Sequence, residues 1–195
     1  MKISQNSNNN KSAVEAGLYP AVCFALIDLG TQDNEYQGKK ITQRKVILKF
    51  ELLDEFSEED KRIVLSQIYT LSMNEMSKFR KHLKGWRGRD FTDEELSGFE
   101  PKNILNTNVI LNVIENDKGR AIIDGMARYK DDPIKSDRNI EYFSFDEFDD
   151  EFLPEFISDG IANLIEKSHQ WKNLSKSGVV NSVKNNEMEA DEIPF

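Results

Sequence analysis

The stretch RIVLSQIYTLSMNEMSKFRKHLKG, residues 62–85, changes from a strand pattern to a helix pattern within its length. Residues 62–71 are rich in the β-branched and aromatic residues that strands favour. Residues 72–75, Ser-Met-Asn-Glu, fit a capping box, in which a Ser hydroxyl and a Glu side chain satisfy amide groups at a helix start. Apolar residues at helical spacing follow, namely Met76, Phe79 and Leu83. Gly85 is expected to end this short basic helix.

Two alternating segments precede this stretch. Residues 19–30 predict a strand whose two faces are both partly apolar. Residues 45–52 alternate cleanly, so Lys45, Lys49 and Glu51 are expected to face outward. The inward positions of the same segment are Val46, Leu48, Phe50 and Leu52. Together with residues 62–71, these segments predict a three-stranded antiparallel meander.

Two more strand candidates follow the helix. Residues 92–95, Thr-Asp-Glu-Glu, repeat the capping signature and predict a second helical turn. Residues 109–115 and 120–129 are joined by an Asn-Asp-Lys-Gly turn and read as a hairpin. The order is therefore three strands, a helix and two strands. This is the order of the OB-fold, a five-stranded Greek-key barrel with a helix between strands 3 and 4. We expect an all-β core in a chain that is α+β overall.

An apolar stripe with Pro154 at its start predicts an added C-terminal helix over about residues 154–169, packed on the barrel. The stripe consists of Leu153, Phe156, Ile157, Ile161, Leu164 and Ile165. The expected organisation is a flexible N-terminus over residues 1–12, one domain over residues 13–171, and a disordered linker and acidic tail over residues 172–195. A length of 195 residues suits one domain of ordinary size with such tails.

Composition excludes several classes of protein. A lone Cys23 cannot form an internal disulfide, and two His residues cannot complete a zinc site with it. We therefore expect no metal and no cofactor. With 31% charged residues, the chain has no apolar run long enough to cross a bilayer, and residues 1–12 lack the apolar centre of a signal peptide. The sequence predicts a soluble, cytoplasmic protein with no membrane partner, and it leaves homodimer formation open.

The net charge of −9 is unevenly distributed. Residues 39–138 carry twenty basic and eighteen acidic residues, whereas residues 139–195 carry four basic and thirteen acidic ones. The middle of the chain therefore has the cations that phosphate contacts require, despite the acidic average. Such asymmetry indicates separate tasks for the two parts.

The last nine residues, EMEADEIPF, combine acids with an Ile-Pro-Phe end. They resemble the C-terminal tip of bacterial single-stranded-DNA-binding proteins. A terminal Phe fits a small apolar pocket ringed by Arg or Lys, and the acids fit a basic surround. An ordinary acidic tail is the alternative interpretation. Ala190 interrupts the acids here, unlike the bacterial tip, which implies a different affinity or different host partners. The expected partner-binding residues are Asp191, Glu192, Ile193, Pro194 and Phe195.

Four segments resemble a phage family of single-stranded-DNA-binding proteins. They are residues 17–19 (GLY), 27–32 (IDLGTQ), 69–72 (YTLS) and 86–92 (WRGRDFT), and the likeness spans about residues 13–129. The resemblance implies an OB-fold, binding of single-stranded DNA with little sequence preference, and a role in phage DNA replication, recombination or repair. It places the protein in the cytoplasm of the infected bacterial host. The tail is then expected to recruit polymerase, helicase, primase or nuclease proteins.

Binding of single-stranded DNA requires cations along the backbone and aromatic faces on which bases stack. The candidate contacts are Tyr36, Lys39, Lys45, Lys49, Tyr69, Arg80, Lys84, Trp86, Arg87, Arg89, Arg120, Arg128 and Tyr129. Two of the aromatic candidates have a second interpretation. Trp86, with Phe91, could instead anchor the helix in the core while Arg87 and Arg89 pair with Asp90, Asp93 or Glu94. Tyr69 could equally be a core residue.

Two rival functions remain open. In the first, the OB barrel binds another protein of the replication machinery, and the chain is an adaptor without direct DNA contact. Cations scattered over several surfaces would favour it. In the second, the acids between Asp146 and Glu151 gather a divalent metal for phosphodiester cleavage. The interleaved Phe145, Phe148 and Phe152 favour a segment that docks on the barrel, and we expect no enzyme. We also expect the acidic tail to occupy the basic DNA site until DNA displaces it.

Overall fold

Six strands and four α-helices make up the fold in this computed structural model, which describes residues 14–178 and 180. The strands are β1 (Gly17–Tyr36), β2 (Lys39–Phe56), β3 (Arg62–Thr70), β4 (Asn108–Glu115), β5 (Ala121–Arg128) and β6 (Glu141–Phe143). The helices are α1 (Lys78–Arg87), α2 (Asp93–Ser97), the 3-10 helix η1 (Pro101–Ile104), α3 (Asp159–Glu166) and α4 (His169–Lys176). The predicted order of five strands with a helix after the third is confirmed.

One mostly antiparallel sheet contains all six strands in the order β3-β2-β1-β4-β5, with β6 added in parallel beside β1. The long strand β1 pairs with β2 along one edge. Its other edge pairs first with β4, over Gly17–Val22, and then with β6, over Ala25–Ile27. In the described chain no backbone pairing joins β3 to β5, so the sheet is open where a closed barrel was predicted.

Helix α1 lies between the two unpaired edges and links them through side chains. Lys78 Nζ lies 2.7 Å from the Ile123 carbonyl of β5 and 3.4 Å from Gln67 Oε1 of β3. A Cβ on Gly85 would lie 2.1 Å from the Met126 carbonyl oxygen, so the helix backbone rests directly on β5. The helix therefore occupies the place where β3 and β5 would otherwise meet.

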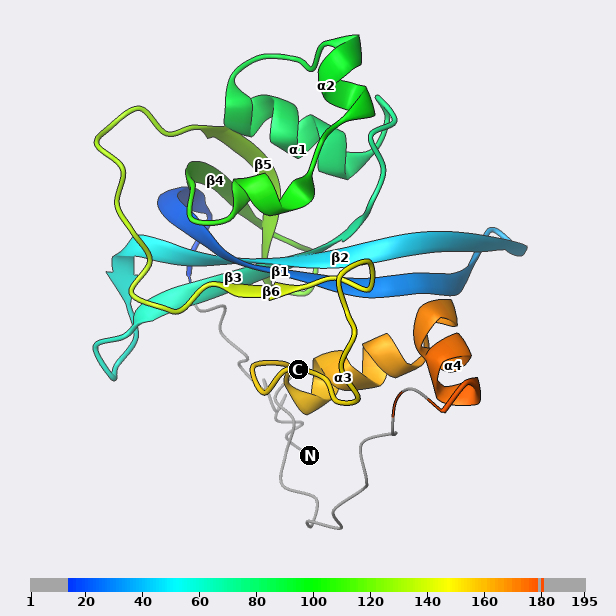
Figure 1. The fold of residues 1–195 in the computed structure, drawn as a ribbon. Coiled ribbons are helices and arrows are strands. Elements are labelled where there is room, and N and C mark those ends of the chain that lie inside the picture. The colour runs from blue at the N-terminus through cyan, green and yellow to red at the C-terminus, as the bar shows by residue number, and fades with distance from the viewer. Residues whose placement is uncertain (1–13, 179, 181–195) are drawn as a thin grey trace, which may run out of the picture.

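The sheet carries an apolar core on each face (Figure 1). The first core lies under α1 and contains Phe50, Phe79 and Trp86. The second lies under α3 and α4 and contains Ile27, Ile165 and Trp171. Residues 21–30 of β1 are buried throughout, which agrees with the two partly apolar faces predicted for this strand. Strand β1 is therefore the wall that the two cores share.

The boundaries of α1 differ from the prediction. Ser77, not Ser72, caps the helix by accepting from the Arg80 amide. The Ser72 hydroxyl instead accepts from the Asn74 amide, which makes residues 72–77 a turn and leaves Met76 77% exposed. The helix runs through Gly85 and ends at Gly88, whose φ of 73° is left-handed.

The C-terminal helix is also divided differently. Two short helices, α3 and α4, replace the single helix predicted over residues 154–169, and Ser158 and Ser168 precede them. The buried Ser168 hydroxyl accepts from the Trp171 amide, so it starts the second helix. Both helices pack on β1, as predicted for this part of the chain. Within the described residues, no helix has the length and apolar character needed to span a membrane.

Candidate nucleic-acid interface

One face of β2 and β3 points away from the first core and carries both lysine side chains and exposed strand residues. We call it the outer face. Its cross-strand pairs are Lys45 with Thr70, Ile47 with Ile68, and Lys49 with Ser66. Ser66 is exposed and Ile68 is 45% exposed, whereas Ile47 is buried in the second core. The part of the outer face on β3 is therefore the part open to a ligand.

The two predicted lysines of the outer face differ in their partners. Lys45 Nζ donates to the neutral Asn34 amide oxygen at 3.1 Å, so its charge stays available to an anion. Lys49 Nζ lies 2.7 Å from Glu141 Oε2, and both side chains are largely buried. A phosphate approaching Lys49 would compete with this carboxylate.

The β1–β2 hairpin continues the outer face beyond β3. Strand β3 pairs with β2 only from Lys45 onward, so the tip of the hairpin extends past it (Figure 1). Gln37 and Gly38 form the turn with positive φ, and Lys39 beside them is exposed. The side chain of the predicted contact Tyr36 lies outside the described residues.

Tyr69 and Trp86 are core residues, which corrects their place among the predicted stacking platforms. Tyr69 is 2% exposed and Trp86 is 7% exposed. The Trp86 indole Nε1 donates to the Asn108 carbonyl at 2.6 Å, and its ring lies 5.8 Å from that of Phe50. Phe91 is buried as well. The interpretation of Trp86 and Phe91 as anchors of the helix is the one that fits, because a base needs an accessible ring face.

Four predicted cations around α1 are held by two acids. Asp90 lies 2.8 Å from Lys84 Nζ and 3.4 Å from Arg80. Glu95 Oε1 lies 2.6 Å from Arg89 Nη2 and also forms an ion pair with Arg87. The Arg89 and Arg87 guanidiniums hold the pKa of Glu95 well below its usual range. Pairing of Arg87 and Arg89 with acids was a predicted alternative, but the acid that holds both is Glu95 and not Asp90, Asp93 or Glu94.

The remaining predicted cations do not join the outer face. Arg128 ends β5 beside Gly88, the residue that follows α1, whereas Arg120 precedes the other end of β5. Tyr129 is half-buried, and desolvation raises its pKa, as do Asp131, Asp54 and Asp132. The predicted cations are therefore spread over several surfaces, the arrangement that was expected to favour the adaptor.

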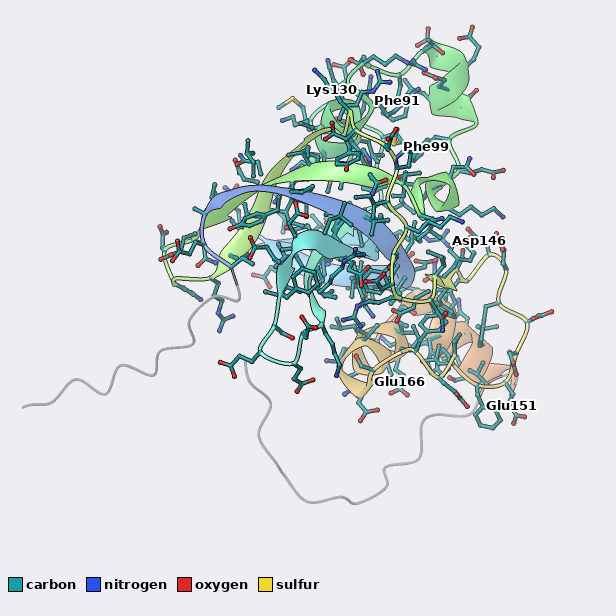
Figure 2. The ribbon with its side chains drawn as sticks, turned by 90° about the vertical axis from the view of Figure 1, so that its left-hand side faces the viewer. Phe91, Phe99, Lys130, Asp146, Glu151 and Glu166 are labelled. Atoms are coloured by element: carbon teal, nitrogen blue, oxygen red, sulfur yellow. The ribbon has the colours of Figure 1, made fainter. Side chains whose placement is uncertain are left out.

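Two acids of the run near β6, Asp146 and Glu147, are engaged in ion pairs. Asp146 lies 2.9 Å from Arg44, and Glu147 Oε1 lies 2.9 Å from Lys102. Phe145 and Phe148 pack against the second core, as predicted for a docking segment, but Phe152 is 60% exposed. Figure 2 shows Asp146 on the same side of the molecule as Phe99, and the two residues line one pocket. In the described chain, no three His, Cys, Asp or Glu residues are grouped to hold a metal ion.

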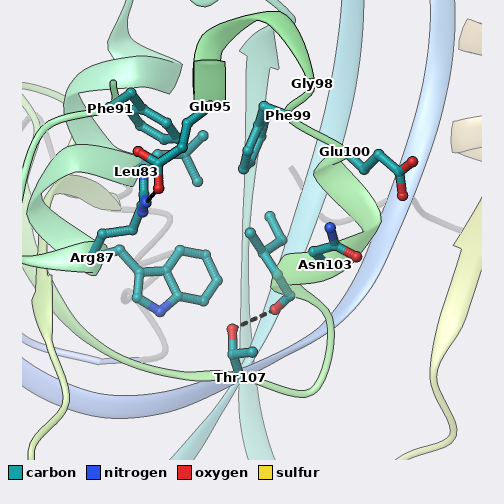
Figure 3. Close-up of a pocket in the computed structure, with 11 residues that line it drawn as sticks. Leu83, Arg87, Phe91, Glu95, Gly98, Phe99, Glu100, Asn103 and Thr107 are labelled. Atoms are coloured by element: carbon teal, nitrogen blue, oxygen red, sulfur yellow. Dashed lines mark hydrogen bonds and ion pairs between the residues drawn. The ribbon is translucent and has the colours of Figure 1, made fainter. Parts of the chain in front are cut away.

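A groove of about 390 Å³ between α1, α2 and η1 was not predicted. Its walls are mostly apolar and include Trp86, Phe91, Phe99 and Ile104 (Figure 3). Arg87 enters it beneath Glu95, with its guanidinium 4.2 Å from the Phe91 ring centroid. The buried Nη1 of Arg87 has no hydrogen-bond partner among the described residues. The sequence signal was the pair of Phe residues on either side of α2, whose rings meet edge to face at 5.3 Å.

The predicted tail residues Asp191 to Phe195 lie outside the described residues. Comparison of the chain with protein-family models, with curated proteins and with solved structures finds no match.

Proposed function

We propose that this protein binds single-stranded DNA, largely without sequence preference, through an OB-fold-like sheet. The observation that carries the proposal is the outer face, where Ser66 and Ile68 stay exposed beside Lys45. OB-folds bind oligonucleotides on the face of strands 2 and 3 and on the loop that joins strands 1 and 2. In this chain that loop is the β1–β2 hairpin tip with Lys39.

The chemistry of the outer face suits an unpaired strand. Lys45 and Lys39 supply charge for phosphates, and binding would release the counterions that screen them. Ile68 offers an apolar contact to a base or sugar edge without reading its hydrogen-bonding groups. Recognition of this kind depends on the DNA backbone and on the faces of the bases, which are accessible in a single strand. It therefore favours single strands of any sequence.

The acidic tail gives the protein its second proposed task. Asp191, Glu192, Ile193, Pro194 and Phe195 would bind replication or recombination proteins that carry a basic, apolar pocket. The protein would then coat and protect exposed strands while its tail brings partners to them. This use fits phage DNA replication, recombination or repair in the cytoplasm of the host bacterium. The proposal involves no catalysis and no cofactor.

A second candidate function, a protein adaptor, rests on a different observation. The groove between α1 and α2 is apolar and contains Arg87 Nη1, which has no hydrogen-bond partner in the described part of the chain. Four cations around α1 are already engaged by acids. Such a groove suits a peptide better than a phosphate backbone. The adaptor would bind its partners through this groove and the tail and would not bind DNA.

Fluorescence anisotropy of a labelled thymidine 20-mer separates the two candidates. Both Trp side chains are buried, so a label on the DNA reports binding more directly than tryptophan emission. We expect saturable binding at micromolar protein in low salt, with weaker binding of duplex of equal length. Salt should weaken the binding because phosphates are contacted. Absence of binding in low salt would remove the proposed function and favour the adaptor.

A further inference from the structure

Residues 130–140 cross from β5 to β6 and form a strap that is attached by a small number of polar contacts. Ser136 is its one residue that is not exposed. At one point, the Asn108 side chain bonds the main chain of Ile134 twice, donating to the carbonyl at 2.9 Å and accepting from the amide at 3.0 Å. Figure 1 shows the strap as the yellow-green trace that passes the edge of the sheet on its way to β6.

The second attachment of the strap is a buried carboxylate of the sheet. Glu51 of β2 is 1% exposed. Its Oε2 accepts from the Ser136 hydroxyl and from the Asp137 amide, both at 2.8 Å. Arg138 Nε lies 3.3 Å from Oε1, and Arg62 lies 3.6 Å from Oε2. Arg62 Nε is buried without a hydrogen-bond partner among the described residues. The strap therefore supplies Glu51 with donors and a positive charge, and its Asp137 carboxylate lies 3.2 Å from Arg62, where a phosphate could take its place.

An aromatic ring lies under this strap. Phe24 is the extra residue of a β-bulge in β1, between Cys23, which belongs to the first core, and Ala25, which pairs with Lys49. Phe24 is 2% exposed, yet it is part of neither apolar core. The Arg138 guanidinium lies 5.6 Å from its ring centroid. Arg138 of the strap thus lies over an aromatic ring that is one residue away from the strand partner of Lys49.

We infer that Phe24 is a base-stacking residue of the single-strand site, and that residues 130–140 leave it when DNA binds. The inference rests on the proposed function. Displacement of the strap exposes the Phe24 face to a base and frees Arg62 for a phosphate in place of the strap. The closed form keeps the ring away from water and from wrong partners. Because opening has a cost, the measured affinity includes that cost as well as the contacts.

Hydrogen exchange of two amides reports strap displacement directly. The Ile134 and Asp137 amides are bonded to Asn108 and Glu51, so both are protected only while the strap is closed. We expect a saturating thymidine 20-mer to speed their exchange by about ten-fold or more, while the Leu111 amide within β4 is unchanged. Slower or unchanged exchange of both amides in protein with DNA bound would overturn the displacement.

Asn108→Ala tests the cost of opening. The substitution removes both side-chain bonds to the strap and keeps the Asn108 carbonyl that binds Trp86. We expect tighter binding of the thymidine oligomer, by about three-fold or more, because less free energy is needed to open the strap. Asn112→Ala, the same change on the same strand beside Gly125, is the matched control and should bind like wild type. Equal affinity of the two variants would contradict a displaceable strap.

Phe24→Leu tests the stacking itself. We expect weaker binding of the thymidine oligomer by about five-fold or more, the size of one base–aromatic stack. Binding of an abasic oligomer of equal length should stay unchanged, since it offers phosphates and no base. Weaker binding of both oligomers would assign Phe24 a structural role. Unchanged binding of both oligomers would show that Phe24 does not contact a base. Phe24→Tyr, which keeps a ring, should preserve the preference for bases even where Phe24→Leu folds poorly.

Failure of the inference is distinguishable from failure of the proposed function. The wild-type protein could bind thymidine oligomers while the strap amides stay protected and Phe24→Leu binds as tightly. The proposed function would then stand, and this inference would be wrong. A wild-type protein that binds no oligomer loses both.

Discussion

The Tyr69 hydroxyl lies 2.9 Å from His82 Nδ1, and His82 Nε2 lies 2.9 Å from the Asp124 carbonyl. A carbonyl can only accept, so Nε2 carries the proton and Nδ1 accepts from the tyrosine. One neutral imidazole on α1 thereby connects β3 to β5 across the opening of the sheet. Burial lowers the pKa of His82, and the nearby Lys78 ammonium lowers it further.

Stability should fall in mild acid because of His82. The folded state keeps the imidazole neutral, whereas the unfolded chain takes up a proton below about pH 6.5. The contribution is therefore complete above that pH and is lost as pH falls towards the lower folded pKa, with a slope of at most about 1.4 kcal/mol per pH unit. Urea unfolding between pH 5 and 7.5 measures it. His82→Gln should flatten the profile, and an unchanged profile in this variant would assign the pH dependence to other groups.

Gly85→Ala should destabilise the protein although alanine favours helices. The new Cβ would lie 2.1 Å from the Met126 carbonyl oxygen, which belongs to the backbone and cannot turn aside. We expect a loss of about 1–3 kcal/mol, as for other overpacked sites. Gly160→Ala in α3 is the control, because its Cβ meets nothing within 4 Å and should stabilise by up to about 1 kcal/mol. Equal thermal shifts in the two variants would refute the close packing of α1 on β5.

The salt dependence of DNA binding should decrease when cations of the outer face are neutralised. Lys45→Gln and Lys39→Gln should each lower the slope of log affinity against log salt by about 0.7, if each residue contacts one phosphate. Lys167→Gln changes an exposed lysine after α3 and should leave the slope unchanged. Anisotropy titrations at four salt concentrations give the slopes. Identical slopes for all three variants would place the phosphates elsewhere.

Removal of Asp191 to Phe195 should change two measurements in opposite directions. The segment carries two of the acids of a strongly anionic region, so its loss should tighten DNA binding in low salt and have little effect in high salt. Capture of replication proteins from a host extract should disappear. A variant with Asp191→Asn and Glu192→Gln separates charge from the Ile-Pro-Phe contacts. Unchanged values for both measurements would remove any exchange between tail and DNA.

The strands were predictable because their patterns are local. Alternation placed Val46, Leu48, Phe50 and Leu52 in the core, where all four are buried, and the Thr92 capping box is present in α2. The start of α1 was not predictable in this way. Ser72 and Ser77 both offer a capping hydroxyl, and the turn that engages Ser72 decides between them. Whether the sheet closes depends on α1 packing against β5, which no local pattern contains.

The candidate site was less predictable than the fold. Lys49 was correctly placed on the outward side of β2, but its partner Glu141 is 92 residues away in sequence. Phe24 was recognised as a strand residue, while its cover comes from residues more than a hundred positions later. Such pairs depend on how the chain returns over the sheet. Residue type and alternation therefore predict the face of a side chain better than its accessibility.

Strand β1 is the wall of both cores, and this has a consequence for the order of events during synthesis. Ile27 and Leu29 leave the ribosome about 130 residues before Ile157 and the helices that cover them. At ordinary elongation rates the apolar underside of β1 waits on the order of ten seconds for its cover. These side chains of the second core therefore stay exposed to water during that interval, whereas the first core can assemble as soon as β5 has emerged.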